Sequence, residues 1–420
     1  MKIVNRSRIV CALALVVVAH CGIHARGLEA APTREAFLKL IDRPRVDPKV
    51  DVGDPVEADG LKTSTFSYAS EADERVPGIV IYPANAGVKL PCVIVMHGTG
   101  GNKEGEKGLL KKLALKGCLA IAIDARFHGE RAKPLPGLEK YNQAIVSKFK
   151  GETKTFPFYW DTAYDVMRLI DILYARDDVD NSRIGLIGFS KGGIETYFIA
   201  AADPRVTVAI PCIGVQSFKW GLENDAWHNR VNTVKGAFLE SAKITGVEKP
   251  DAAFAKTFFD KVVPGIYGEF DGPEMVPLIA PRPLLMINGD SDGNTPLPGV
   301  LICAEKVKAA YARLNASDKF KTNRRTEDRP QSDRGLARGD HGVFREAFGT
   351  VVRSESRELG AMNTPSISLL RRVRFHSRVQ ILPRSPLTPR RSTGVGPLPN
   401  RRGVRLGFTH PLFRWIALLF

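Results

Sequence analysis

Residues 184–193 read Ile-Gly-Leu-Ile-Gly-Phe-Ser-Lys-Gly-Gly, and this motif is the most specific indication of the fold in the sequence. Its apolar start predicts a buried strand, and residues 191–202 have a composition compatible with a helix. A serine set between a strand and a helix in a G-x-S-x-G motif is typical of a sharp turn that exposes a nucleophile. We therefore predict that Ser190 is the nucleophile of a hydrolytic site, and that the backbone amide of Lys191 faces an oxyanion.

The same alternation of strand and helix patterns continues on both sides of this motif. Apolar runs of strand length alternate with segments that have helical spacing of apolar residues, and no internal repeat interrupts them. Such an order predicts an α/β fold, with a mostly parallel central sheet and helices on both faces. The expected strands are 61–68, 78–82, 91–96, 118–123, 183–187, 206–211 and 283–287, and the expected helices are 104–116, 161–175, 191–202 and 297–314.

We assign residues 61–321 to this α/β domain and residues 26–60 to an N-terminal extension. Two long segments, 130–159 and 216–280, leave the carboxyl ends of expected strands and carry several aromatic residues. Loops at that edge of a parallel sheet usually form the binding site. We therefore interpret 216–280 as a lid-like insertion; a plain surface excursion is the alternative.

The N-terminus resembles an export signal. Lys2, Arg6 and Arg8 precede an apolar run at residues 9–19, and Ala25 is a plausible cleavage point, so residues 1–25 form the expected signal peptide. The run is too short for a stable membrane span, which needs about 20 apolar residues. We expect an exported protein, periplasmic or secreted; an uncleaved anchor and a wrongly assigned start codon are the alternatives.

Most of the net charge of +16 lies in the last quarter of the chain. Residues 1–321 hold 42 basic and 38 acidic residues, whereas residues 322–420 hold 19 Arg, no Lys and 7 acidic residues. Because the body is nearly neutral, we expect no nucleic-acid partner. The segment 322–420 has three interpretations: a disordered basic tail, a small extra module, or a frame-shifted translation of GC-rich DNA.

A second glycine-rich stretch, His97-Gly-Thr-Gly-Gly101, follows the expected strand 91–96. An oxyanion needs a second backbone donor, and we assign that role to the amide of Thr99 or Gly100. The glycine spacing does not fit a phosphate-binding loop or a dinucleotide-binding turn. Since the six cysteines include no C-x-x-C pair, we expect neither a disulfide scaffold nor a thiolate zinc site.

The acid is expected at the end of strand 283–287, where Asp290 and Asp292 lie in the loop NGDSDGNTP. Either carboxylate could orient an imidazole, and either could simply stabilise the turn; we favour Asp292. If the order along the chain is serine, acid, histidine, then His341, His376 and His410 remain as candidates for the base. We choose His341 because it is nearest.

Four other residues are expected to shape the substrate pocket. His97 and His128 lie in loops after expected strands, and both precede the serine in the chain. Trp160 and Trp220 lie in or beside the two long aromatic segments.

Taken together, these motifs resemble the α/β-hydrolase superfamily, nearest to its dienelactone hydrolase, acetyl xylan esterase and prolyl-oligopeptidase-like branch. The resemblance rests on motifs that occur in the order typical of that family and cover about residues 60–320. They are HGTGG at 97–101, DARFHG at 124–129, WDTAYDVMRLIDIL at 160–173, GFSKGG at 188–193 and NGDSDGNTP at 288–296. In that family the acid is the second Asp of such a loop, which supports Asp292.

The resemblance implies a two-step acyl transfer by Ser190, Asp292 and His341 without a metal or cofactor. The implied substrate is a small-molecule or carbohydrate ester, and the oligomeric state is left open. Two alternatives stand beside it: a serine peptidase of the prolyl-oligopeptidase-like type, and an inactive hydrolase fold that only binds. After residue 321 the pattern departs from the family.

Overall fold

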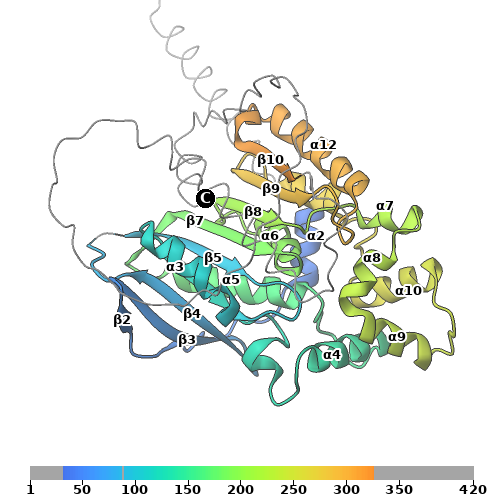
Figure 1. Ribbon diagram of the computed structural model, residues 1–420, viewed down its shortest axis with the longest axis horizontal. Helices are drawn as coiled ribbons and strands as arrows, with labels where there is room; N and C mark the ends of the chain where they lie inside the picture. Colours follow the sequence, from blue (N-terminus) through green and yellow to red (C-terminus); the bar gives the residue numbers. More distant parts are fainter. Residues whose placement is uncertain (1–31, 88, 326–420) are drawn as a thin grey trace, which may run out of the picture. The chain divides into compact units, whose positions relative to one another are not determined.

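The computed structural model describes residues 32–87 and 89–325, whose strands form one sheet (Figure 1). Its order is β1-β3-β4-β6-β5-β7-β8-β9-β10, with β2 paired to β3. The strands are β1 (Asp51–Val52), β2 (Val56–Ala58), β3 (Leu61–Glu71), β4 (Glu74–Pro83), β5 (Leu90–Met96), β6 (Leu119–Ile123), β7 (Val179–Phe189), β8 (Val208–Cys212), β9 (Leu284–Gly289) and β10 (Phe320–Arg325).

The helices lie between these strands and in two long insertions. The α-helices are α2 (Pro32–Ile41), α3 (Lys107–Leu115), α4 (Glu139–Lys150), α5 (Trp160–Tyr174), α6 (Lys191–Ala202), α7 (Phe218–Glu223), α8 (His228–Val231), α9 (Lys235–Ile244), α10 (Ala252–Val262), α11 (Gly272–Met275) and α12 (Leu297–Arg313). Short 3-10 turns occur at η1 (Lys103–Glu106), η2 (Gly129–Ala132), η3 (Asn232–Val234), η4 (Val276–Ile279) and η5 (Ser317–Lys319).

The strands from β6 to β10 along the sheet are parallel, whereas β1 to β4 pair antiparallel at one edge. All residues of β5 and β6 are buried, as parallel strands covered on both faces require. The chain runs one way along the sheet from β5 to β6, and the opposite way through β7 to β10. Right-handed connections therefore place α3 on one face, and α5, α6 and α12 on the other.

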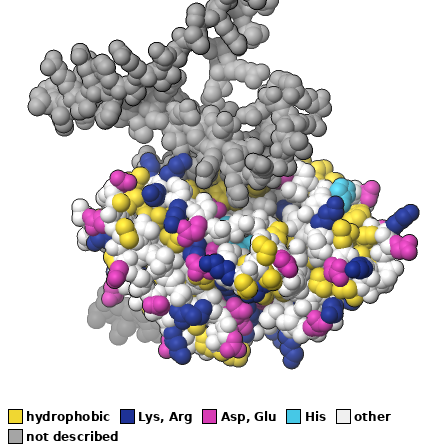
Figure 2. Space-filling model, turned by 60° about the horizontal axis from the view of Figure 1, so that its bottom comes forward, with side chains coloured by type: hydrophobic (Ala, Val, Ile, Leu, Met, Phe, Trp, Pro, Cys, Tyr) yellow, Lys and Arg dark blue, Asp and Glu magenta, His cyan; other side chains and the backbone are white. Residues whose placement is uncertain are grey.

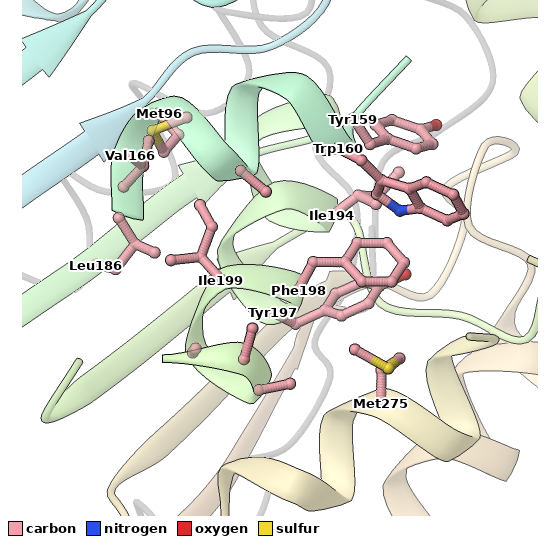
Figure 3. Close-up of a cluster of buried hydrophobic side chains, with 14 of the residues drawn as sticks. Met96, Tyr159, Trp160, Val166, Leu186, Ile194, Tyr197, Phe198, Ile199 and Met275 are labelled. Atoms are coloured by element: carbon pink, nitrogen blue, oxygen red, sulfur yellow. The ribbon is translucent and has the colours of Figure 1, made fainter. Parts of the chain in front are cut away.

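The larger core lies on the face covered by α5 and α6, where aromatic rings fill the space between helices (Figure 3). Trp160 at the start of α5 packs edge-on against Phe37 of α2 at 5.8 Å between ring centroids, and against Phe270 at 5.7 Å. Phe198 of α6 stacks on Phe37 at 5.2 Å. Burying each such side chain stabilises the fold by about 1.5–3 kcal/mol, so this cluster fixes α2 and α5 on α6.

The prediction of a mostly parallel α/β sheet is confirmed, and most element boundaries lie within a few residues of those expected. The helix 191–202 has the bounds predicted for it. Two domain boundaries differ. Residues 32–58 are not a separate extension, because α2 packs in the core and β1 and β2 pair with β3. The strand β10 runs to Arg325 and so crosses the boundary drawn at 321/322.

The two long insertions pack against each other beside the sheet (Figure 1). Phe149 of α4, in the first insertion, stacks on Phe258 of α10, in the second, with 5.7 Å between ring centroids. Phe238 of α9 meets the same Phe258 edge-on at 5.3 Å. We call residues 216–280 together with α4 the helical cap. Its shared aromatic core means that the two insertions form one unit.

Charged side chains of both signs are interspersed over the face shown in Figure 2, without a broad region of one sign. This arrangement agrees with the nearly balanced charge of residues 1–321. Within the part of the chain that the structure describes, no helix combines the length and the apolar character needed to span a membrane.

Candidate active site

The strand ends bring the predicted motifs to one edge of the sheet. Ser190 directly follows β7, and the loops after β5, β6, β8 and β9 end at the same edge because these strands are parallel. Ser190 is partly exposed and has φ +54° and ψ −112°. A non-glycine residue in this region is strained, and such strain persists where the surrounding structure over-determines it. The turn from β7 into α6 therefore has the geometry of a nucleophile elbow.

Glycines make this turn possible because backbone segments pass unusually close to it. A Cβ atom on Gly188 would lie 2.2 Å from the carbonyl oxygen of Gly192. One on Gly192 would lie 2.4 Å from the carbonyl oxygen of Met96, at the end of β5. No other residue fits either position without moving the backbone. Because Gly188 and Gly192 have no side chains, the start of α6 can pack directly against the end of β5.

The loop after β5 lies directly beside the serine. A Cβ atom built on Gly98 would be 3.6 Å from Cβ of Ser190. The Ala125 amide donates to Nε2 of His97 at 3.1 Å, so His97 carries its proton on Nδ1 and donates to the Gly98 carbonyl at 2.8 Å. Gly101 donates to the same carbonyl at 3.0 Å. These two bonds fix the orientation of the Gly98–Thr99 peptide, because a peptide unit is planar.

A buried ionic network holds the neighbouring loop, which carries the motif DARFHG. Asp124 accepts from the Lys103 amide at 2.8 Å, from Nζ of Lys103 at 3.0 Å and from the Glu130 amide at 2.9 Å. Arg126 forms two bonds of 2.9 Å with Asp165 of α5. Burial opposes the ionisation of Asp165, but its arginine partners outweigh burial and keep its pKa well below the usual range. The motif is therefore a structural support for the site.

Of the four residues predicted to shape the pocket, three are buried and one is partly exposed. Trp160 is 0% exposed and lies in the core, so the prediction that it lines the pocket is wrong. His97 and His128 are also buried. Nδ1 of His128 donates to the Arg126 carbonyl at 2.7 Å, and burial, with the nearby charge of Lys191, lowers its pKa well below 6.5. Both imidazoles therefore hold the loops in place behind the site. Trp220, in α7, remains half-buried.

The loop after β9 contains both candidate acids. The Asn294 amide donates to Oδ1 of Asp292 at 2.9 Å, and the Thr295 hydroxyl donates to its Oδ2. Oδ1 of Asp290 is buried and has no hydrogen-bond partner among the described residues. Ser190 and this loop follow strands that are two positions apart in the sheet, a separation of about 10 Å at the strand spacing. A histidine ring can bridge a gap of that size. His341 itself lies outside the described residues.

A short loop after β8 lies between these two strand ends. A Cβ atom on Gly214 would lie 2.9 Å from the Ser190 carbonyl oxygen. Nδ2 of Asn288 donates to the Val215 carbonyl at 3.3 Å. With its amide oriented to match its neighbours, Gln216 accepts from Nε of Arg230 at 2.6 Å and donates to the Asn294 carbonyl at 3.1 Å. Gln216 and Arg230 were not predicted, because no motif marks them.

Behind the serine, Lys191 and Glu195 form an ion pair one helical turn apart, with side chains 1% and 0% exposed. Burial raises the pKa of Glu195 to about 7 and lowers that of Lys191, because both charges are removed from water. The pair lies in the first turn of α6, whose leading amide has no acceptor within the helix.

We expect Lys191→Met to destabilise the protein by about 3–5 kcal/mol, because it leaves a buried carboxylate without its partner. The double variant Lys191→Met/Glu195→Gln should recover most of that loss, since no uncompensated charge remains. Urea unfolding of both variants and of Glu195→Gln gives the coupling energy. Additive effects of the two substitutions would contradict a coupled pair.

Among residues 32–87 and 89–325, no three His, Cys, Asp or Glu side chains are grouped so that they could hold a metal ion. The four cysteines of this part are buried and unpaired. The chemistry that these residues offer is thus a strained serine hydroxyl, backbone amides beside it and a carboxylate two strands away.

Several known proteins are similar to this chain. Residues 40–216 match the family model described as acetyl xylan esterase (AXE1). YtaP of Bacillus subtilis (strain 168), a protein named as a hydrolase, is 26% identical over 265 residues, which cover 60% of this chain and 77% of YtaP.

Two solved structures share the fold. The acetyl xylan esterase from Paenibacillus sp. R4 is 20% identical, with 76% of this chain and 92% of that chain covered at a TM-score of 0.53. Acetyl xylan esterase 1 from Thermoanaerobacterium sp. JW/SL YS485 is 18% identical, with 78% and 93% covered at a TM-score of 0.54. At these identities the two structures support the fold, and the family match supports ester hydrolysis.

Proposed function

We propose that this protein, a carboxylic ester hydrolase of the α/β-hydrolase superfamily, is an exported serine esterase acting on acylated carbohydrates. The observation that carries the proposal is the strained Ser190 at the turn from β7 into α6, with the Gly98 loop directly against it. The substrate class follows the acetyl xylan esterase family match. Export follows the N-terminal pattern of residues 1–25.

In the proposed mechanism, Oγ of Ser190 attacks the ester carbonyl while His341 takes the hydroxyl proton. The negative charge moves to the carbonyl oxygen, which the amide of Lys191 and an amide of the 98–100 loop stabilise. Between the two predicted loop donors, the geometry favours Thr99. Its N–H points opposite to the Gly98 carbonyl, which His97 and Gly101 hold on the other side of the peptide.

The tetrahedral intermediate then collapses. The bond from the carbonyl carbon to the alcohol oxygen breaks, and His341 returns its proton to the departing alcohol. Water attacks the acyl-enzyme in the same way, with His341 as base, and releases the carboxylic acid and free Ser190. Asp292 orients the imidazole and stabilises its charged form. The helical cap lies beside this edge, and we assign it the role of a lid over the substrate.

The test compares three substrates with the purified protein. We expect release of acetate from acetylated xylooligosaccharides and hydrolysis of p-nitrophenyl acetate, with no measurable cleavage of a proline-containing peptide anilide. Faster cleavage of the anilide than of the esters would instead support the peptidase alternative. The same preparation, recovered from the periplasm or medium, should begin at residue 26 when its N-terminus is sequenced. An intact Met1 in that fraction would argue against the signal peptide.

A further inference from the structure

Within the described part of the chain, a buried arginine of the helical cap has no carboxylate partner. Arg230, in α8, is 4% exposed, and its buried Nη2 atom has no hydrogen-bond partner among residues 32–87 and 89–325. Its guanidinium lies 6.0 Å from the ring of Phe218, and its Nε atom donates to the neutral amide of Gln216. Among the described residues, none of the ion pairs involves this arginine. A positive charge is therefore held inside the protein by uncharged groups.

The other buried arginines near the site are arranged differently. Arg126 and Arg131 both contact the carboxylate of Asp165, and both also approach Glu74. Buried charges are generally paired, because removing an ion from water costs several kcal/mol unless an opposite charge and hydrogen bonds replace the water. Arg230 lacks this compensation. Its missing counter-charge therefore needs an explanation.

A carboxylate in the neighbourhood of Arg230 is already hydrogen-bonded to other groups. Asp271 accepts from the Ser217 hydroxyl at 2.7 Å and from the backbone amides of Phe218, Lys219 and Gly272 at 2.7, 3.3 and 2.7 Å. These bonds tie it to the start of α7, and burial raises its pKa. Its four donors leave it no role as the partner of Arg230.

Gln216 links Arg230 to the loop that carries Asp292. It also bonds the Asn294 carbonyl, and Asn294 is the residue whose amide holds Asp292. Gln216 lies two residues beyond Gly214, which packs against the Ser190 carbonyl. The buried hydroxyl of Tyr197, in α6, also has no hydrogen-bond partner within the described part of the chain. Through Gln216, this cap arginine is thus connected to both loops that flank the catalytic edge.

We propose that Arg230 forms a subsite for a carboxylate group carried by the ester substrate. A guanidinium matches a carboxylate with two parallel hydrogen bonds, and the Nη2 atom is the donor that the protein leaves unused. The subsite deepens the proposed esterase function and rests on it: the substrate would be an acyl ester whose acid or alcohol part bears a carboxylate. Water-free surroundings make such a contact selective against neutral esters.

Matched ester pairs test this assignment on both sides of the scissile bond. Mono-p-nitrophenyl succinate is compared with its neutral succinamide analogue, and 4-acetoxybenzoate is compared with 4-acetoxybenzamide. In at least one pair, the wild-type protein should prefer the anionic ester by about 10- to 100-fold in kcat/KM, the range expected for charge-assisted hydrogen bonds. Arg230→Gln should abolish the preference with little effect on the neutral esters, and Arg230→Lys should keep part of it. An equal loss on both members of each pair would overturn the proposal.

A second variant guards against simple misfolding. Gln216→Glu places a carboxylate against Nε of Arg230 and neutralises its charge within the protein, so the anionic preference should disappear. Because the new carboxylate also loses the bond to the Asn294 carbonyl, thermal unfolding is measured alongside to show that the variant is folded. Unchanged preference in Gln216→Glu would count against the subsite.

Binding separates this proposal from the esterase function. In the Ser190→Ala background, succinate or 4-hydroxybenzoate should raise Tm, and the added Arg230→Gln substitution should remove that shift. A shift without any ester turnover by the wild type would keep the subsite and reject the esterase. Ester turnover by the wild type, with neither a Tm shift nor an anionic preference, would keep the esterase function and reject the subsite.

Discussion

Ser190→Ala is expected to lower kcat/KM for p-nitrophenyl acetate by at least about 10⁴-fold, because no acyl-enzyme can form without the hydroxyl. Ser190 is the partly exposed residue at the turn from β7 into α6, and its hydroxyl is presented by a backbone that few residues adopt. Residual activity should come only from substrate binding and the backbone amides beside the serine. Initial rates at saturating and low substrate concentrations, measured against the uncatalysed reaction, give the loss.

Two comparisons make the result specific. Ser182→Ala changes an exposed serine of β7 whose hydroxyl donates to Asp180, and it should leave the rate unchanged. Ser190→Gly should be as inactive as Ser190→Ala but more stable, by about 0.5–1 kcal/mol or more, because glycine relieves the strain of φ +54°. If Ser190→Ala kept a tenth of the wild-type rate, the nucleophile would have to lie elsewhere in the chain.

The fold was predictable because its core signals are local. Strands of a parallel sheet are buried on both faces, so β5 and β6 appear in the sequence as short continuous apolar runs. The turn at Ser190 was predictable for a different reason. Only glycine fits where Gly188 and Gly192 approach other backbone, and this steric requirement leaves a visible spacing in the sequence. The ester hydrolase prediction, made from such motifs, is confirmed by the family match.

Other features depend on contacts between distant residues and left no local signal. The strands β1 and β2 have two and three residues, too few to show an alternating pattern. Trp160 belongs to an aromatic run that suggested a pocket wall, but the packing of α2 and α5 on α6 buries it completely. Gln216 and Arg230 are brought together only by the folding of the cap over the strand ends, so no spacing along the chain reveals them.

Removal of the imidazole of His341 should have the second largest effect, a loss of at least about 10³-fold in kcat/KM, because the serine then loses its general base. The strand β10 is parallel to β9, so the chain leaves it at the edge that holds Ser190 and Asp292. His341 lies sixteen positions beyond Arg325, the end of that strand.

His376→Ala and His410→Ala serve as matched controls, since both residues also follow the acid in the chain. Neither substitution should change the rate. Only the wild type and these two variants should show an activity that decreases as the pH is lowered below about 6.5, where the base becomes protonated. Loss of activity in His376→Ala or His410→Ala, with His341→Ala active, would move the base to that residue. An inactive wild-type protein that still unfolds cooperatively in urea would show an intact fold without a working base. Resequencing the gene around codon 322 would then decide whether the segment that follows β10 is encoded as given.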